Sequence, residues 1–346
     1  MAHLLAVVLL SVPVMQAAAD DATGTETSPS AASQAGSQQV PQPDSSQLVS
    51  SRPVTHLDKT VCDAAALKDL AIRRQVAAPA PEQIEAGSYR LTRWPALGDD
   101  QRPADDEPME FIEIDRGGDC QLLVADRFAT FVSARLPLAG AKPPQLIISS
   151  YSGGAHCCFT YYAVSLGDAG IAADRLDTAD SPIDLVGLGD GDVPDITYAD
   201  MAFAYWNTAF ADSPTGQVRL TWDKDRYRLA DPQQVPAPSE IEQAAWQAAM
   251  TAAIRAMPGP YVPIAEQNNG KPGAAMDPVI WSHLLDLIYA GYPDLARDLF
   301  DRAWPDDVPG KGLFWRDFVT QLQQASVIWK PWHLATVLVP DLPARP

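Results

Sequence analysis

Phe111-Ile112-Glu113-Ile114-Asp115 alternates apolar and polar side chains, and Val218-Arg219-Leu220-Thr221-Trp222 follows the same pattern further along the chain. A period of two is typical of a β-strand that buries one face. Short segments with β-character recur from Tyr89 onward, separated by Gly, Pro and Asp: Tyr89–Trp94, Glu110–Asp115, Cys120–Ala125, Thr130–Leu136, Gln145–Ser150, Cys158–Ser165, Ile196–Tyr198 and Gln217–Leu229. Because no long helical pattern lies between them, these segments predict an antiparallel β-sandwich or a barrel-like sheet.

Helical periodicity begins after Pro236. Ser239, followed three residues later by Glu242, is a capping-box pattern that marks the start of a helix. The apolar spacing predicts helices at 239–257, 277–291, 294–303 and 312–328, with Asp277 as the cap of the second, and one earlier helix at 64–75. The predicted fold class is therefore α+β, with a mainly β domain at 55–235 followed by a small all-helical domain at 236–346.

Residues 1–19 are typical of a secretory signal peptide. Leu4–Val14 forms the apolar stretch, which is shorter than the ~20 residues that a membrane span needs, and Ala17-Ala18-Ala19 supplies small residues before the cleavage site. Residues 20–54 are almost entirely small or polar and predict a disordered linker. We expect the mature protein in the periplasm or outside the cell, with no transmembrane segment after signal cleavage.

The formal net charge of −19 disfavours nucleic acids and anionic membranes as partners, since both attract basic surfaces. The sequence contains no HExxH, G-x-S-x-G, P-loop or Rossmann motif, and no catalytic residue is assigned. We expect a non-catalytic cell-envelope protein with a binding or structural role, whose partner is another envelope protein or an extracellular ligand. The alternative is an envelope hydrolase in which Ser152, His156 and the Asp190–Asp195 loop converge.

The run Ser152-Gly153-Gly154-Ala155-His156-Cys157-Cys158 holds two of the four cysteines side by side. A bond between adjacent cysteines is strained, because their Cα atoms lie only about 3.8 Å apart. We therefore expect two disulfides that join Cys157 and Cys158, in either order, to Cys62 and Cys120. Two other interpretations stay open: a copper(I) or zinc site with His156 and the thiolates as ligands, and a cysteine nucleophile with His156 as base. The paired glycines predict a tight turn or a bulge before the second strand.

A second candidate site is the acidic run Gly189-Asp190-Gly191-Asp192-Val193-Pro194-Asp195-Ile196. Carboxylates that alternate with glycines suit calcium, which takes roughly 6–8 oxygen ligands from a chain that folds sharply around the ion. The predicted metal ligands are Asp190, Asp192 and Asp195, with Asp200 as a fourth candidate, and the predicted cofactor is calcium. A solvated acidic turn is the alternative.

The order of these motifs resembles a group of uncharacterised secreted bacterial proteins. In that group a Gly-Gly-Ala-His-Cys-Cys strand precedes a D-x-D-G-D-G-x-x-[DE] loop of the FG-GAP or VCBS type, then an aromatic Phe-x-Tyr segment and a Trp-Asp hairpin. The corresponding segments here are Ser152–Cys158, Gly189–Ile196, Phe203-Ala204-Tyr205 and Trp222–Tyr227. The resemblance covers Gln145–Leu229 and implies a calcium-binding type of loop, although at least one ligand of the family pattern is missing.

The helical part resembles one tetratricopeptide hairpin. Trp281 and Leu284 match the first helix of that motif, and Ala296, Phe300 and Ala303 match the second. Such arrays need about three stacked units to bury a continuous core, and the pattern occurs once. The resemblance therefore implies a helical hairpin that packs on its neighbours.

Overall fold

The structure is a computed structural model that describes residues 62, 64–75, 80–98, 109–132, 145–154, 157–187, 193–223, 226–232, 236–263 and 276–339. The predicted signal peptide and linker, residues 1–54, lie outside the described residues. Within the described residues, three antiparallel four-stranded sheets precede most of the helices, so the predicted α+β class is confirmed.

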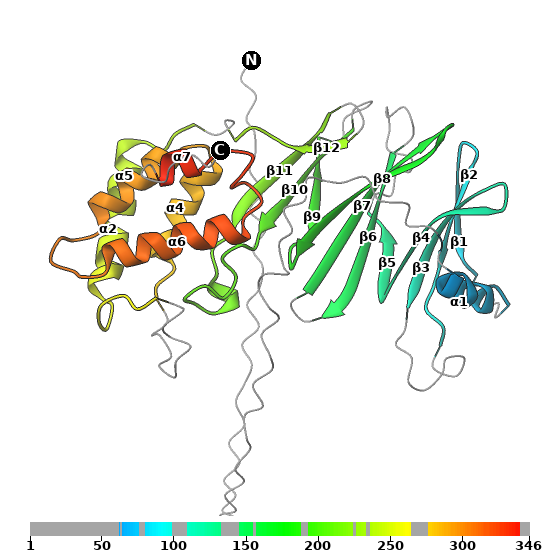
Figure 1. Cartoon of the computed structure of the whole chain (residues 1–346), viewed down its shortest axis with the longest axis horizontal. Helices are drawn as coiled ribbons and strands as arrows, with labels where there is room; N and C mark the ends of the chain where they lie inside the picture. Colours follow the sequence, from blue (N-terminus) through cyan, green and yellow to red (C-terminus); the bar gives the residue numbers. More distant parts are fainter. Residues whose placement is uncertain are drawn as a thin grey trace, which may run out of the picture. The chain divides into compact units, whose positions relative to one another are not determined.

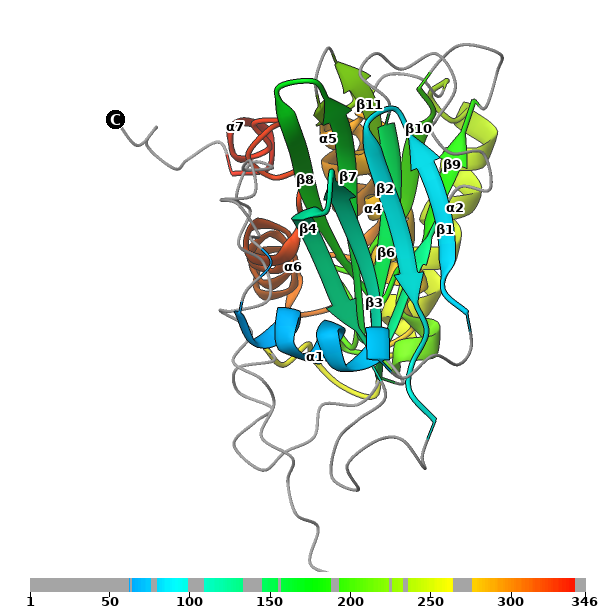
Figure 2. The ribbon, with the colours of Figure 1, turned by 90° about the vertical axis from the view of Figure 1, so that its right-hand side faces the viewer.

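The first sheet has the strand order β1-β2-β3-β4, and its members are β1 (Glu82–Ala86), β2 (Tyr89–Trp94), β3 (Glu110–Arg116) and β4 (Asp119–Asp126). Helix α1 (Ala64–Gln75) lies across one end of this sheet, as Figure 2 shows from that side. Leu70 of α1 packs with Phe111 and Leu123, and the guanidinium of Arg73 lies 4.4 Å from the centroid of the Phe111 ring. The helix therefore buries one side of the alternating pattern in β3.

The middle sheet has the order β5-β6-β7-β8, with β5 (Phe128–Phe131), β6 (Gln145–Gly154), β7 (Cys157–Gly167) and β8 (Gly170–Ala179). It packs face to face against the first sheet (Figure 1). Leu91, Ile112 and Ile114 of the first sheet share a buried cluster with Leu146 and Ile148 of the middle sheet. This pair of sheets is the predicted sandwich, built from residues at the two-residue spacing seen in the sequence.

An ion pair from the first sheet caps the backbone of edge strand β5. The carboxylate of Glu110 accepts a hydrogen bond from the Ala129 N–H at 3.1 Å, and Arg93 Nε donates to the Ala129 carbonyl at 2.9 Å. Arg93 Nη2 also donates to Glu110 at 2.9 Å. Because these groups occupy the donor and acceptor of Ala129, this part of the edge is closed to another strand.

The third sheet has the order β12-β11-β10-β9, with β9 (Ile183–Val186), β10 (Asp195–Asp200), β11 (Gly216–Asp223) and β12 (Arg226–Leu229). Its buried face joins one large core with the middle sheet and the helices, which includes Ile147, Tyr161, Val218, Leu220, Trp281 and Phe314. At Gly216 the chain passes so close to α4 that an added Cβ would lie 2.3 Å from the Tyr289 ring. The third sheet and the helices that follow Pro236 therefore share one continuous core.

The C-terminal helices are α2 (Glu240–Arg255), α4 (Val279–Tyr289), α5 (Pro293–Ala303), α6 (Lys311–Ala325) and the short α7 (Ala335–Leu338). The predicted capping box is confirmed, since Ser239 Oγ accepts from the Glu242 N–H and Glu242 accepts from the Ser239 N–H. Asp277 caps α4 through a 3.0 Å hydrogen bond from the Val279 N–H. Among the described residues, no helix is both long and apolar enough to cross a membrane.

Candidate functional site

The predicted cysteine cluster lies on the hairpin of β6 and β7. Gly153 has a left-handed φ of 78°, and the pairing of the two strands shifts register between Tyr151 and Gly154, so the predicted glycine bulge is confirmed. A Cβ at position 153 would lie 2.4 Å from Cδ of Arg127 and 3.2 Å from the ring of Phe128. The backbone conformation therefore favours glycine, and a side chain at this position would also displace the side chain of Arg127. His156 lies outside the described residues.

The predicted disulfide connectivity is wrong. Cys62 is bonded to Cys120, with Cα atoms 6.2 Å apart, which lies within the usual range for a disulfide. Cys120 lies on β4 in the first sheet and clusters with Cys62 and Leu70 of α1, whereas Cys158 belongs to the middle sheet. Cys158 is itself in a disulfide, so its sulfur is neither a thiolate ligand nor a nucleophile in this structure. The side chain of Cys157 lies outside the described part of the chain.

Stacked aromatic rings brace the same hairpin. Phe128, Tyr151 and Phe159 are cross-strand neighbours on β5, β6 and β7, and their ring centroids are 5.8 Å and 4.4 Å apart in that order. Each such pair is worth about 0.5–1.5 kcal/mol beyond its area burial. Ser152 adds a hydrogen bond, in which its Oγ accepts from the Cys158 N–H at 2.7 Å. These contacts give the Ser152–Cys158 run a structural role.

Of the three predicted calcium ligands, the structure describes only Asp195. Its carboxylate accepts a 2.7 Å hydrogen bond from Arg219 Nε on the neighbouring strand β11, and its side chain is 19% exposed. Asp190 and Asp192 lie outside the described residues. Within the described part of the chain, no group of three or more His, Cys, Asp or Glu side chains is placed to hold a metal. Calcium binding stays a prediction that depends on Asp190 and Asp192.

The loop between β10 and β11 displays an aromatic side chain on an unusual backbone. Tyr205 has a φ of 60° and is 56% exposed. Its ring centroid lies 5.2 Å from that of Phe210, which begins a single 3-10 turn, Phe210–Asp212. The Tyr205 N–H donates to Ser213 Oγ at 3.0 Å, and that hydroxyl donates to the Ala209 carbonyl at 3.0 Å. We call Tyr205, Phe210 and the exposed Asp212 the Tyr205 surface.

Buried aromatic anchors hold this loop on both sides of Tyr205. Phe203 lies 5.1 Å from Phe318 of α6, and Trp206 lies 5.1 Å from Trp281 of α4, both measured between ring centroids. Phe203 is 1% exposed and Trp206 is 4% exposed. The residues on either side thus point into the helical core while Tyr205 points outward.

No family model matches this chain, and no curated protein or solved structure matches it either.

A buried carboxylate fixes the start of the same loop. Asp200 Oδ2 accepts from Tyr289 Oη at 2.5 Å, from Ser326 Oγ at 2.9 Å and from the Val327 N–H at 3.2 Å, and Oδ1 accepts from the Ala202 N–H at 3.0 Å. Burial raises the pKa of Asp200, and the four donors offset part of that rise. Burial and the Asp200 charge also hold the pKa of Tyr289 well above its usual value. Asp200 therefore joins β10 to α4 and the end of α6, and it is not a surface calcium ligand.

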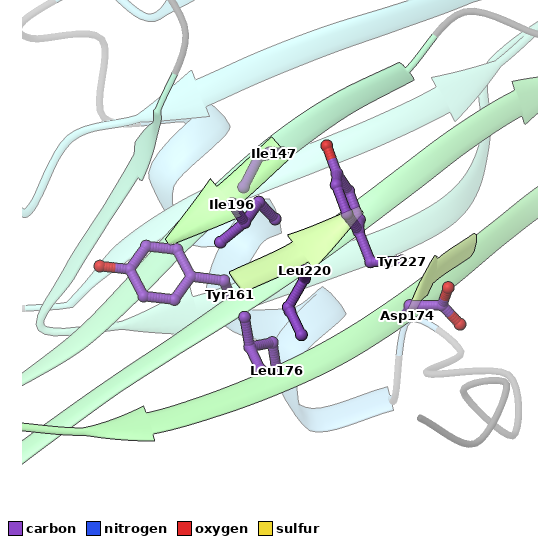
Figure 3. A pocket seen from close by; sticks show the side chains of 8 residues that line it. Ile147, Tyr161, Asp174, Leu176, Ile196, Leu220 and Tyr227 are labelled. Atoms are coloured by element: carbon purple, nitrogen blue, oxygen red, sulfur yellow. The ribbon is translucent and has the colours of Figure 1, made fainter. Parts of the chain in front are cut away.

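A small cavity lies between the middle and third sheets (Figure 3). Its lining includes Ile147, Tyr161, Asp174, Leu176, Ile196, Leu220 and Tyr227. The cavity has room for roughly one water molecule. The Tyr161 hydroxyl accepts from the Ile183 N–H at 3.2 Å and the Tyr227 hydroxyl donates to the Pro194 carbonyl at 2.9 Å. This space is a packing gap and is too small for a substrate.

Tyr205 is not among the functional residues that the sequence predicts. The segment Phe203-Ala204-Tyr205 resembles the Phe-x-Tyr segment of the secreted proteins. The sequence does contain a dense group of aromatic residues, from Phe203 to Phe210, that has neither helical nor strand periodicity. Such a group in a loop indicates either a buried anchor or a displayed surface, and here it provides both.

Proposed function

We propose that this chain is an exported, non-catalytic binding protein of the cell envelope, and that it contacts another envelope protein through the Tyr205 surface. The observation that carries the proposal is the combination of a left-handed φ and high exposure at Tyr205. A bulky residue in this conformation is an outlier that persists only where the surroundings hold it, and such residues cluster at functional sites.

Tyr205 contacts Phe210 within the chain, and its side chain remains largely exposed. The left-handed conformation costs an L-residue about 1–2 kcal/mol, which glycine avoids. Burial of a large side chain would offset that cost, but more than half of Tyr205 remains exposed. A contact with a partner supplies the burial that the chain itself does not provide.

The loop also holds the backbone of Tyr205 in place without a partner. Phe203 and Trp206 are fixed in the core, and Ser213 holds the backbone N–H of Tyr205. A rigid aromatic side chain loses little conformational entropy on binding, and tyrosine is enriched among the residues that dominate interface energies. These features favour protein recognition over a purely structural loop.

Two further observations support the exported location. Residues 1–19 have the pattern of a secretory signal peptide. Cys62 and Cys120 form a disulfide, and disulfides persist mainly in oxidising compartments such as the periplasm.

Site-specific photo-crosslinking tests the proposal. A photoreactive phenylalanine analogue replaces Tyr205 in the full-length protein, which is produced in its source cells and irradiated in envelope fractions. We expect a discrete adduct that excess purified wild-type protein suppresses and that Tyr205→Ala protein does not. The matched control places the analogue at Val186, which is 42% exposed on β9. No adduct at position 205, or the same adduct at both positions, contradicts the proposal.

A further inference from the structure

We infer that the segment docking on the Tyr205 surface is basic, with a lysine or arginine side chain of the partner protein lying against the Tyr205 ring and paired with Asp212. This inference rests on the proposed function and names the chemistry of its partner.

Along the sequence, the charged residues on both sides of this loop are of one sign. From residue 176 to residue 218 aspartate is the only charged residue type, and the whole chain carries a formal net charge of −19. Like charges juxtaposed across an interface are unfavourable, whereas opposite charges steer association and fix the register of the partners. A partner segment that is acidic or uncharged gains no electrostatic attraction from these aspartates. Charge complementarity therefore favours a basic segment.

Three other aspartates of this region are engaged within the chain. Asp195 is paired with Arg219, Asp177 is paired with Arg175, and Asp200 is buried, whereas Asp184 is exposed like Asp212 but lies on β9. Among the described residues, no side chain pairs with the Asp212 carboxylate, which is exposed. It therefore remains available to a cation from outside the chain.

The backbone of Asp212 lies near that of the two aromatic residues. Phe210 and Asp212 belong to the same 3-10 turn, and the next residue, Ser213, bonds the backbone of Tyr205. A cation over the face of a tyrosine is attracted by the ring quadrupole, and a carboxylate nearby adds a charge-assisted hydrogen bond. One lysine or arginine side chain satisfies both, since its aliphatic stem packs on apolar surface and its charged end reaches the carboxylate.

The test uses two fluorescent peptides, one alternating lysine with glycine and the other alternating glutamate with glycine, and measures binding to the full-length mature protein by anisotropy. We expect the lysine peptide to bind and to weaken with added salt, and the glutamate peptide not to bind. Tyr205→Leu and Asp212→Asn should each raise the Kd of the lysine peptide about 3-fold or more, in line with one exposed cation–π or ion-pair contact. Asp184→Asn is the matched control, because Asp184 is exposed on β9 in the same acidic region and should leave the Kd unchanged.

Two outcomes overturn the inference. One is a lysine peptide that does not bind. The other is a lysine peptide that binds all variants with the same Kd, which would mean general attraction to an acidic protein. These results are separable from those of the crosslinking experiment: an adduct at position 205 that is unaffected by Asp212→Asn retains the proposed function and removes the basic partner. Absence of the adduct removes the proposed function itself.

Discussion

Replacement of Tyr205 by glycine should give a more stable protein than its replacement by alanine. Both changes remove the ring, so its contact with Phe210 cancels in the comparison. The remaining difference in the free energy of unfolding comes from the backbone at position 205. At a φ of 60° alanine keeps a strain of about 1–2 kcal/mol, while glycine loses about 0.5–1 kcal/mol more conformational entropy on folding. The net difference is about 0.7 kcal/mol in favour of glycine.

Urea unfolding at fixed pH measures this difference. With an m-value of about 2 kcal/mol/M, the midpoint for Tyr205→Gly should lie about 0.3 M above that for Tyr205→Ala, and the melting temperature should lie about 2 °C higher. Phe128 provides the matched control, because it is a similarly exposed aromatic residue, at 49%, on the extended strand β5. There Phe128→Gly should be less stable than Phe128→Ala by about 0.5–1 kcal/mol. The same order of stabilities at both positions would refute the argument that Tyr205 is strained.

Three other substitutions test interactions that stabilise the fold. Gly153→Ala should destabilise the protein by about 1–2 kcal/mol in urea unfolding, because alanine is strained at a φ of 78° and displaces Arg127; an unchanged midpoint would contradict this. Glu110→Ala should uncap the Ala129 N–H on edge strand β5, lower the free energy of unfolding by about 1–3 kcal/mol and promote self-association in sedimentation experiments. Asp200 should make stability fall with rising pH: its folded pKa is raised above the ordinary value of 3.8, so its contribution is fully present below that value and is lost as pH rises through the folded pKa. The stability of the wild type relative to Asp200→Asn should therefore decline between pH 4 and the folded pKa, and a constant difference would exclude the raised pKa.

Local pattern was enough to predict much of the fold. The predicted helix at 64–75 coincides with α1, and the predicted strand Tyr89–Trp94 coincides with β2, because each has a clear period and a clear boundary. The sequence pattern does not predict strands β1, β8 and β9. In β1 three of the five side chains are exposed, β8 includes several charged residues, and β9 has only four residues, so none of these segments has a clear apolar alternation.

The features that depend on distant parts of the chain could not be predicted in this way. The strain of a bond between neighbouring cysteines favours the two connectivities that do not join Cys62 to Cys120, but the folded chain brings Cys62, before α1, next to Cys120 on β4. The same holds for Asp200. Its four donors come from α4, from the segment after α6 and from its own turn, and no local pattern links them.

The shared core of the third sheet and the helices explains why the strained residue lies in this loop. A left-handed tyrosine on a loop tip would relax to an ordinary conformation unless both neighbouring segments were fixed. Asp200 fixes the start of the loop against α4 and α6, and Trp206 fixes it again one residue after Tyr205. If the helices packed only against each other, neither restraint would exist. If Tyr205 contacts a partner as proposed, the helical part supports that contact through the loop that it holds, so a change that loosens Asp200 or Trp206 should weaken binding at Tyr205 without altering the contact surface itself.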